Sequence, residues 1–125
     1  SNRAIIASGS YVGTGTNGVN NPNSLTFDFV PKMVFMTAAM YPVTGGYYSL
    51  SPLFGYSDPE YYHHVMCADA LSTEYSSSVG FGDAAWPDYH GRKSEDGKTF
   101  YWYVETNAAA QLNAAGTTYY YVAIG

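Results

Sequence analysis

The segment Ser24-Leu-Thr-Phe-Asp-Phe-Val30 decides the fold class, because polar and apolar residues alternate along it from Ser24 to Phe29. Successive residues of an extended strand point to opposite sides, so one face of this segment is apolar and the other is polar. Pro31 ends or kinks the strand, since proline has no amide hydrogen for the sheet ladder. Further strong strand signals come from four segments rich in apolar, aromatic or β-branched residues, namely 4–12, 32–39, 98–105 and 117–124. The run 32–39 is apolar almost throughout, which predicts a strand covered on both faces.

The middle of the chain carries weaker strand signals. Candidate strands over residues 47–50, 61–66 and 75–81 are separated by proline and glycine. Residues 83–97 predict a long loop or a pair of loops, and such loops in a small domain are usually functional. For residues 107–116 two predictions stay open: a short helix with an asparagine N-cap and a glycine at its end, or an irregular connection.

Six to eight short strands with little or no helix predict an all-β protein, an antiparallel β-sandwich of two packed sheets. The length of 125 residues fits a single domain over residues 1–125. The chain begins without methionine, which suggests a piece of a longer protein.

Composition and charge exclude several classes of partner. A net charge of −5 with only five Lys and Arg residues provides no basic surface for nucleic-acid phosphates. No stretch approaches the ~20 apolar residues of a membrane helix, so we expect no membrane insertion. The lone cysteine, Cys67, has no partner within the chain for a disulfide.

Patterns for catalysis or metal binding are weak. Gly13-Thr-Gly-Thr-Asn-Gly18 matches the G-x-G-x-x-G pattern of a dinucleotide-binding loop. No helix is predicted after it to hold a pyrophosphate, so we prefer a loop between two strands. His63 and His64 face opposite sides of a strand, which disfavours a shared metal site with Cys67. Because no paired catalytic motif is present, we expect no enzymatic activity, no cofactor and no metal.

Tyrosine is the outstanding residue type, with 14 in 125 residues. In the run Tyr119-Tyr120-Tyr121, strand alternation puts the first and third rings on one face and the second on the other. Outward rings suit stacking on sugars or packing against another subunit. About half of the tyrosines are expected to be ordinary core and sheet-surface residues.

Sequence segments near both ends of the chain resemble a known family. Residues 9–18 and 21–35, together with residues 97–103, 107–113 and 116–125, resemble the C-terminal domains of phage and prophage tail fibres from gut and Gram-positive hosts. The phrase Phe27-Asp-Phe-Val-Pro-Lys-Met-Val34 is also similar to the small trimeric β-sandwich lectins of the H type.

The resemblance implies a β-sandwich at the C-terminal tip of a fibre on the virion, assembled as a homotrimer and touching the host surface. The matching segments belong to the structural framework of the domain and cover less than half of the chain. Residues 41–96 match no known pattern, so the resemblance carries no binding residue over to this sequence.

We therefore expect a receptor-binding module that holds a bacterial cell-surface glycan. Aromatic rings would stack on sugar faces, and polar side chains would hydrogen-bond to hydroxyls. The candidate binding residues are Trp86, Tyr89, His90, Asp83, Asp88, Arg92, Tyr56, Tyr61 and Tyr62. Two alternatives stay open: a trimerising or capping knob without its own ligand, and a hydrolase that uses Asp83 or Asp88 on the same polysaccharide.

Overall fold

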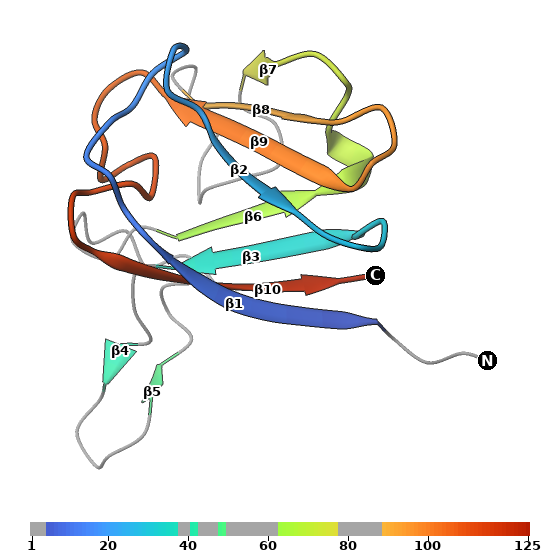
Figure 1. The fold of residues 1–125 in the computed structure, drawn as a ribbon, viewed down its shortest axis with the longest axis horizontal. Coiled ribbons are helices and arrows are strands. Elements are labelled where there is room, and N and C mark those ends of the chain that lie inside the picture. Colours follow the sequence, from blue (N-terminus) through green and yellow to red (C-terminus); the bar gives the residue numbers. More distant parts are fainter. Residues whose placement is uncertain (1–4, 38–40, 43–47, 50–62, 78–88) are drawn as a thin grey trace.

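Two antiparallel sheets pack face to face in the computed structural model, which describes residues 5–37, 41–42, 48–49, 63–77 and 89–125 (Figure 1). The first sheet has the order β1 (Ile6–Val12), β10 (Thr118–Ile124), β3 (Met33–Thr37) and β6 (His63–Cys67). The second has the order β2 (Asn23–Thr26), β9 (Thr99–Val104), β8 (Tyr89–Lys93) and β7 (Ser76–Ser77). A short pair, β4 (Tyr41–Pro42) and β5 (Tyr48–Ser49), and a 3-10 turn over Ala68–Ala70 complete the described elements. The predicted antiparallel β-sandwich is confirmed.

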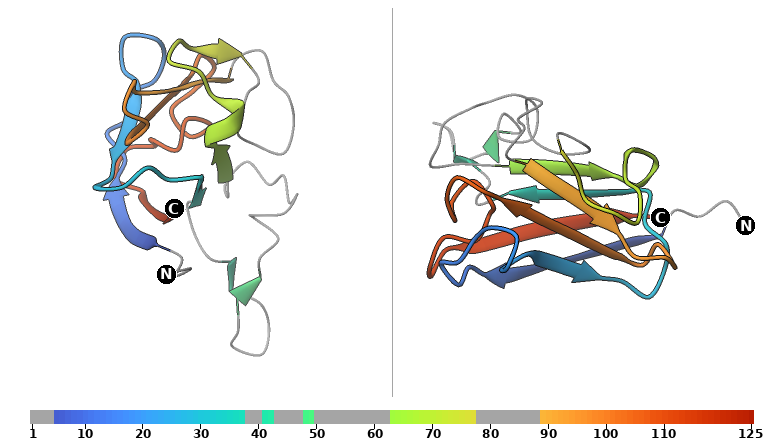
Figure 2. Two further views of the ribbon diagram at one scale, coloured as in Figure 1. Left: turned by 90° about the vertical axis from the view of Figure 1, so that its right-hand side faces the viewer. Right: turned by 90° about the horizontal axis from the view of Figure 1, so that it is seen from above.

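The core lies between the two layers, which Figure 2 shows from two further directions. Every second residue of β9 points inward, and Phe100, Trp102 and Val104 are fully buried. Val34 and Met36 of β3 oppose them from the first sheet and are also fully buried. β3 therefore buries one face completely at Val34 and Met36, while Met33 and Phe35 on its other face are only partly buried, so the predicted cover on both faces is incomplete within β3.

After β2 the chain crosses from the second sheet to the first. The strand expected over residues 24–30 ends at Thr26, because the chain then bends toward the first sheet. The Phe27 amide still donates a hydrogen bond to the Lys98 carbonyl (2.9 Å). The Phe27 ring is buried, with its centroid 5.9 Å from that of Tyr121 in β10. The alternation thus predicted the inward ring correctly and the strand end four residues too late.

The expectation that residues 83–97 form a loop is wrong over Tyr89–Lys93, which form β8, while residues 94–97 form the turn after it. The strand signal is hidden because its composition, Tyr-His-Gly-Arg-Lys, holds a single strong strand former. Alternation is nevertheless present in three dimensions: Tyr89 and Gly91 are buried, while the residues between them are partly exposed. The hairpin to β9 is closed by Asp96, whose Oδ1 accepts hydrogen bonds from Ser94 Oγ (2.6 Å) and the Lys98 amide (3.0 Å).

Residues 107–116 form an irregular connection of turns, the second of the two predictions for this segment. Leu112 has a φ of 59°, in the left-handed region that interrupts a helix. The unusual backbone turns Leu112 into the core, where its side chain is fully buried. Gln111 and Asn113, on either side of it, are buried as well.

The Gln111 side chain joins three parts of the chain inside one end of the sandwich. Its Oε1 accepts hydrogen bonds from the amides of Val104 (2.8 Å) and Gly18 (3.0 Å). Its Nε2 donates to the Asn21 carbonyl (2.7 Å) and to Asn23 Oδ1 (3.0 Å). A primary amide offers two donors and two acceptor positions, so this buried side chain is fully used. Gln111 therefore ties β9 to the loop between β1 and β2.

The Gln111→Ala variant is expected to lose about 3 kcal/mol of unfolding free energy, because buried amide and carbonyl groups lose their partners. Urea unfolding followed by tryptophan fluorescence measures this loss. Asn20→Ala, at an exposed position of the same loop, is the control and should change stability by less than about 0.5 kcal/mol. Equal stability of the two variants would contradict the structural role of Gln111.

Candidate functional site

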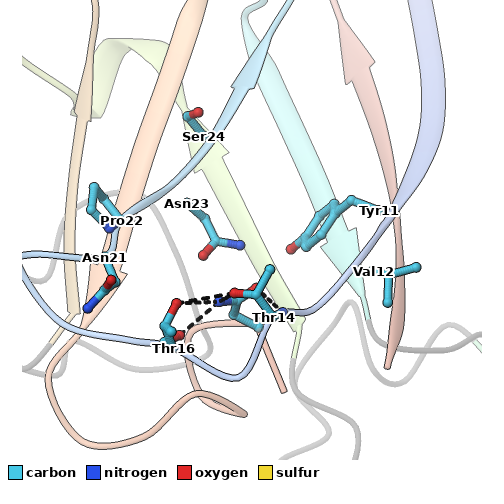
Figure 3. Close-up of a pocket in the computed structure, with 9 residues that line it drawn as sticks. Tyr11, Val12, Thr14, Thr16, Asn21, Pro22, Asn23 and Ser24 are labelled. Atoms are coloured by element: carbon cyan, nitrogen blue, oxygen red, sulfur yellow. Dashed lines mark hydrogen bonds between the residues drawn. The ribbon is translucent and has the colours of Figure 1, made fainter. Parts of the chain in front are cut away.

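A pocket of about 330 Å³ opens at the end of the sandwich, between the end of β1 and the start of β2 (Figure 3). The residues that line it are uncharged, and most carry a hydroxyl or an amide: Tyr11, Val12, Thr14, Thr16, Asn21, Pro22, Asn23, Ser24 and Asn113. We call it the end pocket. The side chains of Thr14, Thr16, Asn21 and Ser24 are exposed and supply polar groups to its rim.

Asn113 forms the floor of the end pocket and holds the loop above it. Its Nδ2 donates hydrogen bonds to Thr14 Oγ1 (2.8 Å) and to the Thr16 carbonyl (2.8 Å). Its Oδ1 accepts one from the Thr14 amide (3.0 Å). The Thr14 and Thr16 hydroxyls also share a hydrogen bond of 3.1 Å (Figure 3). The rim is thus positioned by a buried amide and is not free to collapse onto the pocket.

The glycines of residues 13–18 serve this loop geometry. A Cβ on Gly13 would lie 2.1 Å from the Ala114 carbonyl oxygen, so only glycine allows the loop to approach residues 113–114. Gly18 has a φ of 92° where the chain turns toward β2. The segment leads into a strand, as expected for a loop between two strands, and not into the helix that a dinucleotide loop needs.

Tyr11 supplies an aromatic wall of the end pocket. Its hydroxyl donates a hydrogen bond to the Leu112 carbonyl (2.9 Å), and its ring stacks on Tyr119 with centroids 5.3 Å apart. The Asn23 amide faces the Tyr11 hydroxyl across the pocket (Figure 3). Burial raises the pKa of Tyr11 far above its usual range, Tyr119 adds to the rise, and the Asn23 side chain opposes it. Tyr11 is therefore a neutral hydrogen-bonding group at physiological pH.

A second cluster lies on the outer face of the second sheet, where β7, β8 and β9 run side by side. It consists of Tyr75, His90, Arg92, Tyr101 and Tyr103, and we call it the aromatic face; Tyr103 itself is buried beneath its neighbours. His90 stacks on Tyr103 with centroids 4.5 Å apart and an interplanar angle of 16°. Tyr75 meets Tyr103 edge-on at 4.8 Å. The Arg92 guanidinium carbon lies 3.8 Å from the Tyr101 ring centroid.

Two of the residues predicted from sequence, His90 and Arg92, come together on the aromatic face. They alternate with core-facing residues of β8, so they share its outer side. The imidazole Nε2 of His90 lies 3.1 Å from Glu105 Oε1. Tyr89, the third predicted residue that is described, packs in the core, with its ring centroid 5.3 Å from that of His64. Its ring offers little surface to a ligand.

The remaining predicted residues lie outside the part of the chain that the structure describes. They are Asp83, Trp86, Asp88, Tyr56, Tyr61 and Tyr62. Their assignment as binding residues stays a prediction.

Sequence reasoning missed the end pocket and three of the five residues of the aromatic face, Tyr75, Tyr101 and Tyr103. Tyr101 and Tyr103 stand at alternate positions of a strand that was predicted, so alternation would have placed them on its outer side. No comparable local signal exists for the pocket, because Tyr11 and Asn113 are 102 residues apart in the chain.

Within the described residues, no group of three or more His, Cys, Asp or Glu side chains is arranged to hold a metal ion. His64, one of the histidines weighed as a ligand, is buried, with its Nε2 2.7 Å from the Ala110 carbonyl. The same part of the chain contains no helix with the length and apolar character of a membrane span.

Comparisons with known proteins identify no relative of this chain. No protein-family model, curated protein or solved structure matches it. The functional argument therefore starts from the end pocket and the aromatic face.

The free energy of unfolding should decline above about pH 10, because a tyrosine in the unfolded chain has a pKa of about 10. Burial raises the pKa of Tyr11, Tyr103 and Tyr119 in the folded protein, so the unfolded state loses protons first as the pH rises. For Tyr11, whose pKa is raised far above the usual range, the loss of unfolding free energy is up to about 1.4 kcal/mol per pH unit above that point. The Tyr11→Phe variant, about 1 kcal/mol less stable at pH 7, should therefore show a shallower decline between about pH 10 and 11.5.

Urea unfolding at a series of pH values measures both slopes. Equal slopes for the Tyr11→Phe variant and the parent chain would contradict the burial of the Tyr11 hydroxyl.

Proposed function

We propose that this chain is a carbohydrate-binding module, the receptor-binding tip of a phage tail fibre that recognises a bacterial cell-surface glycan. The end pocket is the observation that carries the proposal. Its described lining is uncharged and rich in hydroxyl and amide groups, beside the aromatic wall of Tyr11. Sugars present hydroxyls that both donate and accept hydrogen bonds, so neutral groups of this kind complement them without the cost of burying a charge.

The rigidity of the end pocket supports a binding role. Asn113 and Gln111, both buried, fix the loop that forms its rim. A pre-formed site binds without a further entropic cost for ordering the loop, which matters when the ligand is small and its affinity weak.

The segments that carry the resemblance to tail-fibre domains also build the end pocket. Residues 9–18 and 21–35 supply its rim and wall, and residues 107–113 supply its floor. These segments are framework segments, so the resemblance supports the proposed position at a fibre tip and carries no binding residue over to the end pocket.

The outer face of the first sheet favours self-association. Ile6 of β1 and Tyr120 and Val122 of β10 point outward and are 65%, 50% and 40% exposed. Phe35 lies beside Val122 in the register and is partly exposed. A contiguous apolar surface of this kind is typical of a subunit interface. We propose the homotrimer that the resemblance implies, and a structural knob without a ligand remains the second candidate.

Binding is tested by staining a panel of gut and Gram-positive bacteria with the labelled domain. Ser24→Phe places a ring at the mouth of the end pocket and should reduce staining at least tenfold, because the ring occupies the ligand's space. Thr26→Phe is the matched control, two residues along the same exposed face of β2 but outside the pocket. Equal staining by both variants would refute the pocket as the site, and no staining by the parent chain would favour the knob.

Assembly is tested by light scattering. Val122→Glu puts a charge into the apolar face and should convert the trimer to a monomer, because an unpaired charge is costly to bury. Thr26→Glu, on the other sheet, should leave the mass unchanged. The monomeric variant should lose most cell staining, since weak single sites depend on multivalent display. A parent chain that is already monomeric would contradict the proposed assembly.

A further inference from the structure

The Arg92 side chain is held in one orientation by two aromatic rings. Its guanidinium carbon lies 3.8 Å from the centroid of the Tyr101 ring and 5.3 Å from that of Tyr75. Cation–π contacts of this kind fix the plane of the guanidinium. Its N–H groups radiate in that plane, so stacking leaves them available at the edge.

The donors of Arg92 are not used within the described part of the chain, where no oxygen accepts a hydrogen bond from them and no carboxylate pairs with the guanidinium. The neighbouring basic residue, Lys93, donates from Nζ to the Ala68 carbonyl (2.9 Å). Glu105, the acid on this face, lies against His90. Arg92 therefore presents a pre-oriented positive charge on a protein whose net charge is −5.

Arg92 and the end pocket belong to one continuous surface. Ser24 on the pocket rim is the register partner of Tyr101, and Tyr101 is the partner of Arg92. All three residues stand at outward-facing positions of their strands. Neighbouring strands are separated by about 5 Å, so Arg92 lies about 10 Å from the rim. A short oligosaccharide seated in the pocket can cross Tyr101 and reach the guanidinium.

We propose that the ligand is an acidic glycan, whose neutral rings occupy the end pocket while a carboxylate or phosphate binds Arg92. A guanidinium edge matches both groups through two parallel N–H···O bonds. Tyr101 lies between the two subsites and provides an apolar surface for the connecting sugar. The inference depends on the proposed function, since it assigns the chemical class of the ligand for the same surface.

The test uses three trisaccharide probes that differ only in the charge of one terminal sugar: a neutral glucose trisaccharide, the same trisaccharide with that sugar oxidised to glucuronate, and the same trisaccharide with a 6-phosphate on that sugar. Each is titrated into the isotope-labelled protein, with the amide signals of Thr16 and Ser24 reporting on the end pocket and the side-chain signal of Arg92 reporting on the second subsite. Either acidic trisaccharide should bind about tenfold more tightly than the neutral one, because a charge-assisted hydrogen-bond pair is added. The acid that binds more tightly identifies a uronate or a phosphate as the natural group.

Three variants isolate the charge. Arg92→Gln should reduce the affinity for the acidic trisaccharide to that of the neutral one and leave the binding of the neutral trisaccharide unchanged. Arg92→Lys keeps the charge but loses the planar fork, so it should recover part of the affinity. Lys32→Gln, an exposed charge next to β3 in the other sheet, is the control and should have no effect. Backbone spectra confirm that each variant is folded.

The possible outcomes separate the inference from the proposed function. If all three probes shift the pocket signals with equal affinity, the acidic subsite is refuted and carbohydrate binding stands. If the acids perturb Arg92 while no probe perturbs the pocket, the anion subsite stands and the pocket assignment fails. If no probe perturbs either region, both are refuted for glucose-based oligosaccharides. Raising the salt concentration should weaken the acidic probes alone.

Discussion

The buried amide of Gln111 is the interaction on which this end of the protein depends. It satisfies the amides of Val104 and Gly18 and the Asn21 carbonyl at once, so a strand of the second sheet and the loop after β1 share one partner. Leaving such groups unpaired in the interior would cost several times what one hydrogen bond contributes. The loop over residues 13–18 therefore has a single low-energy position, and a site built on it is formed before any ligand arrives.

Local patterns in the sequence predict the sheets well and the connections poorly. Alternation in residues 24–30 and the β-branched and aromatic segment 117–124 indicated strands because burial imposes a period of two. The strand β8 was not predicted because glycine, arginine and lysine weaken the strand propensity of its sequence. The role of Gln111 was also invisible, since an alanine-rich segment with one glutamine has the composition of a helix. Only contact with distant segments makes that glutamine a buried centre of hydrogen bonds.

The candidate site shows the same division between local and distant information. His90 and Arg92 were predicted as binding residues, and they share a face because they are two apart on one strand. The end pocket needed the fold, because its rim and floor come from opposite ends of the chain. Rigid sheets, a loop held by buried amides and aromatic rings on one face together form the surface on which the proposed binding of a hydroxyl-rich ligand depends.

Amide hydrogen exchange at Gly18 and Thr14 tests the central claim most directly. Both amides lie in a loop outside any strand, and their acceptors are the side chains of Gln111 and Asn113. If the buried amides hold the loop, these two protons exchange only when the whole domain unfolds, with the same opening free energy as core strands such as β9. Exchange of Gly18 and Thr14 as fast as that of the exposed Asn20 amide would contradict the account.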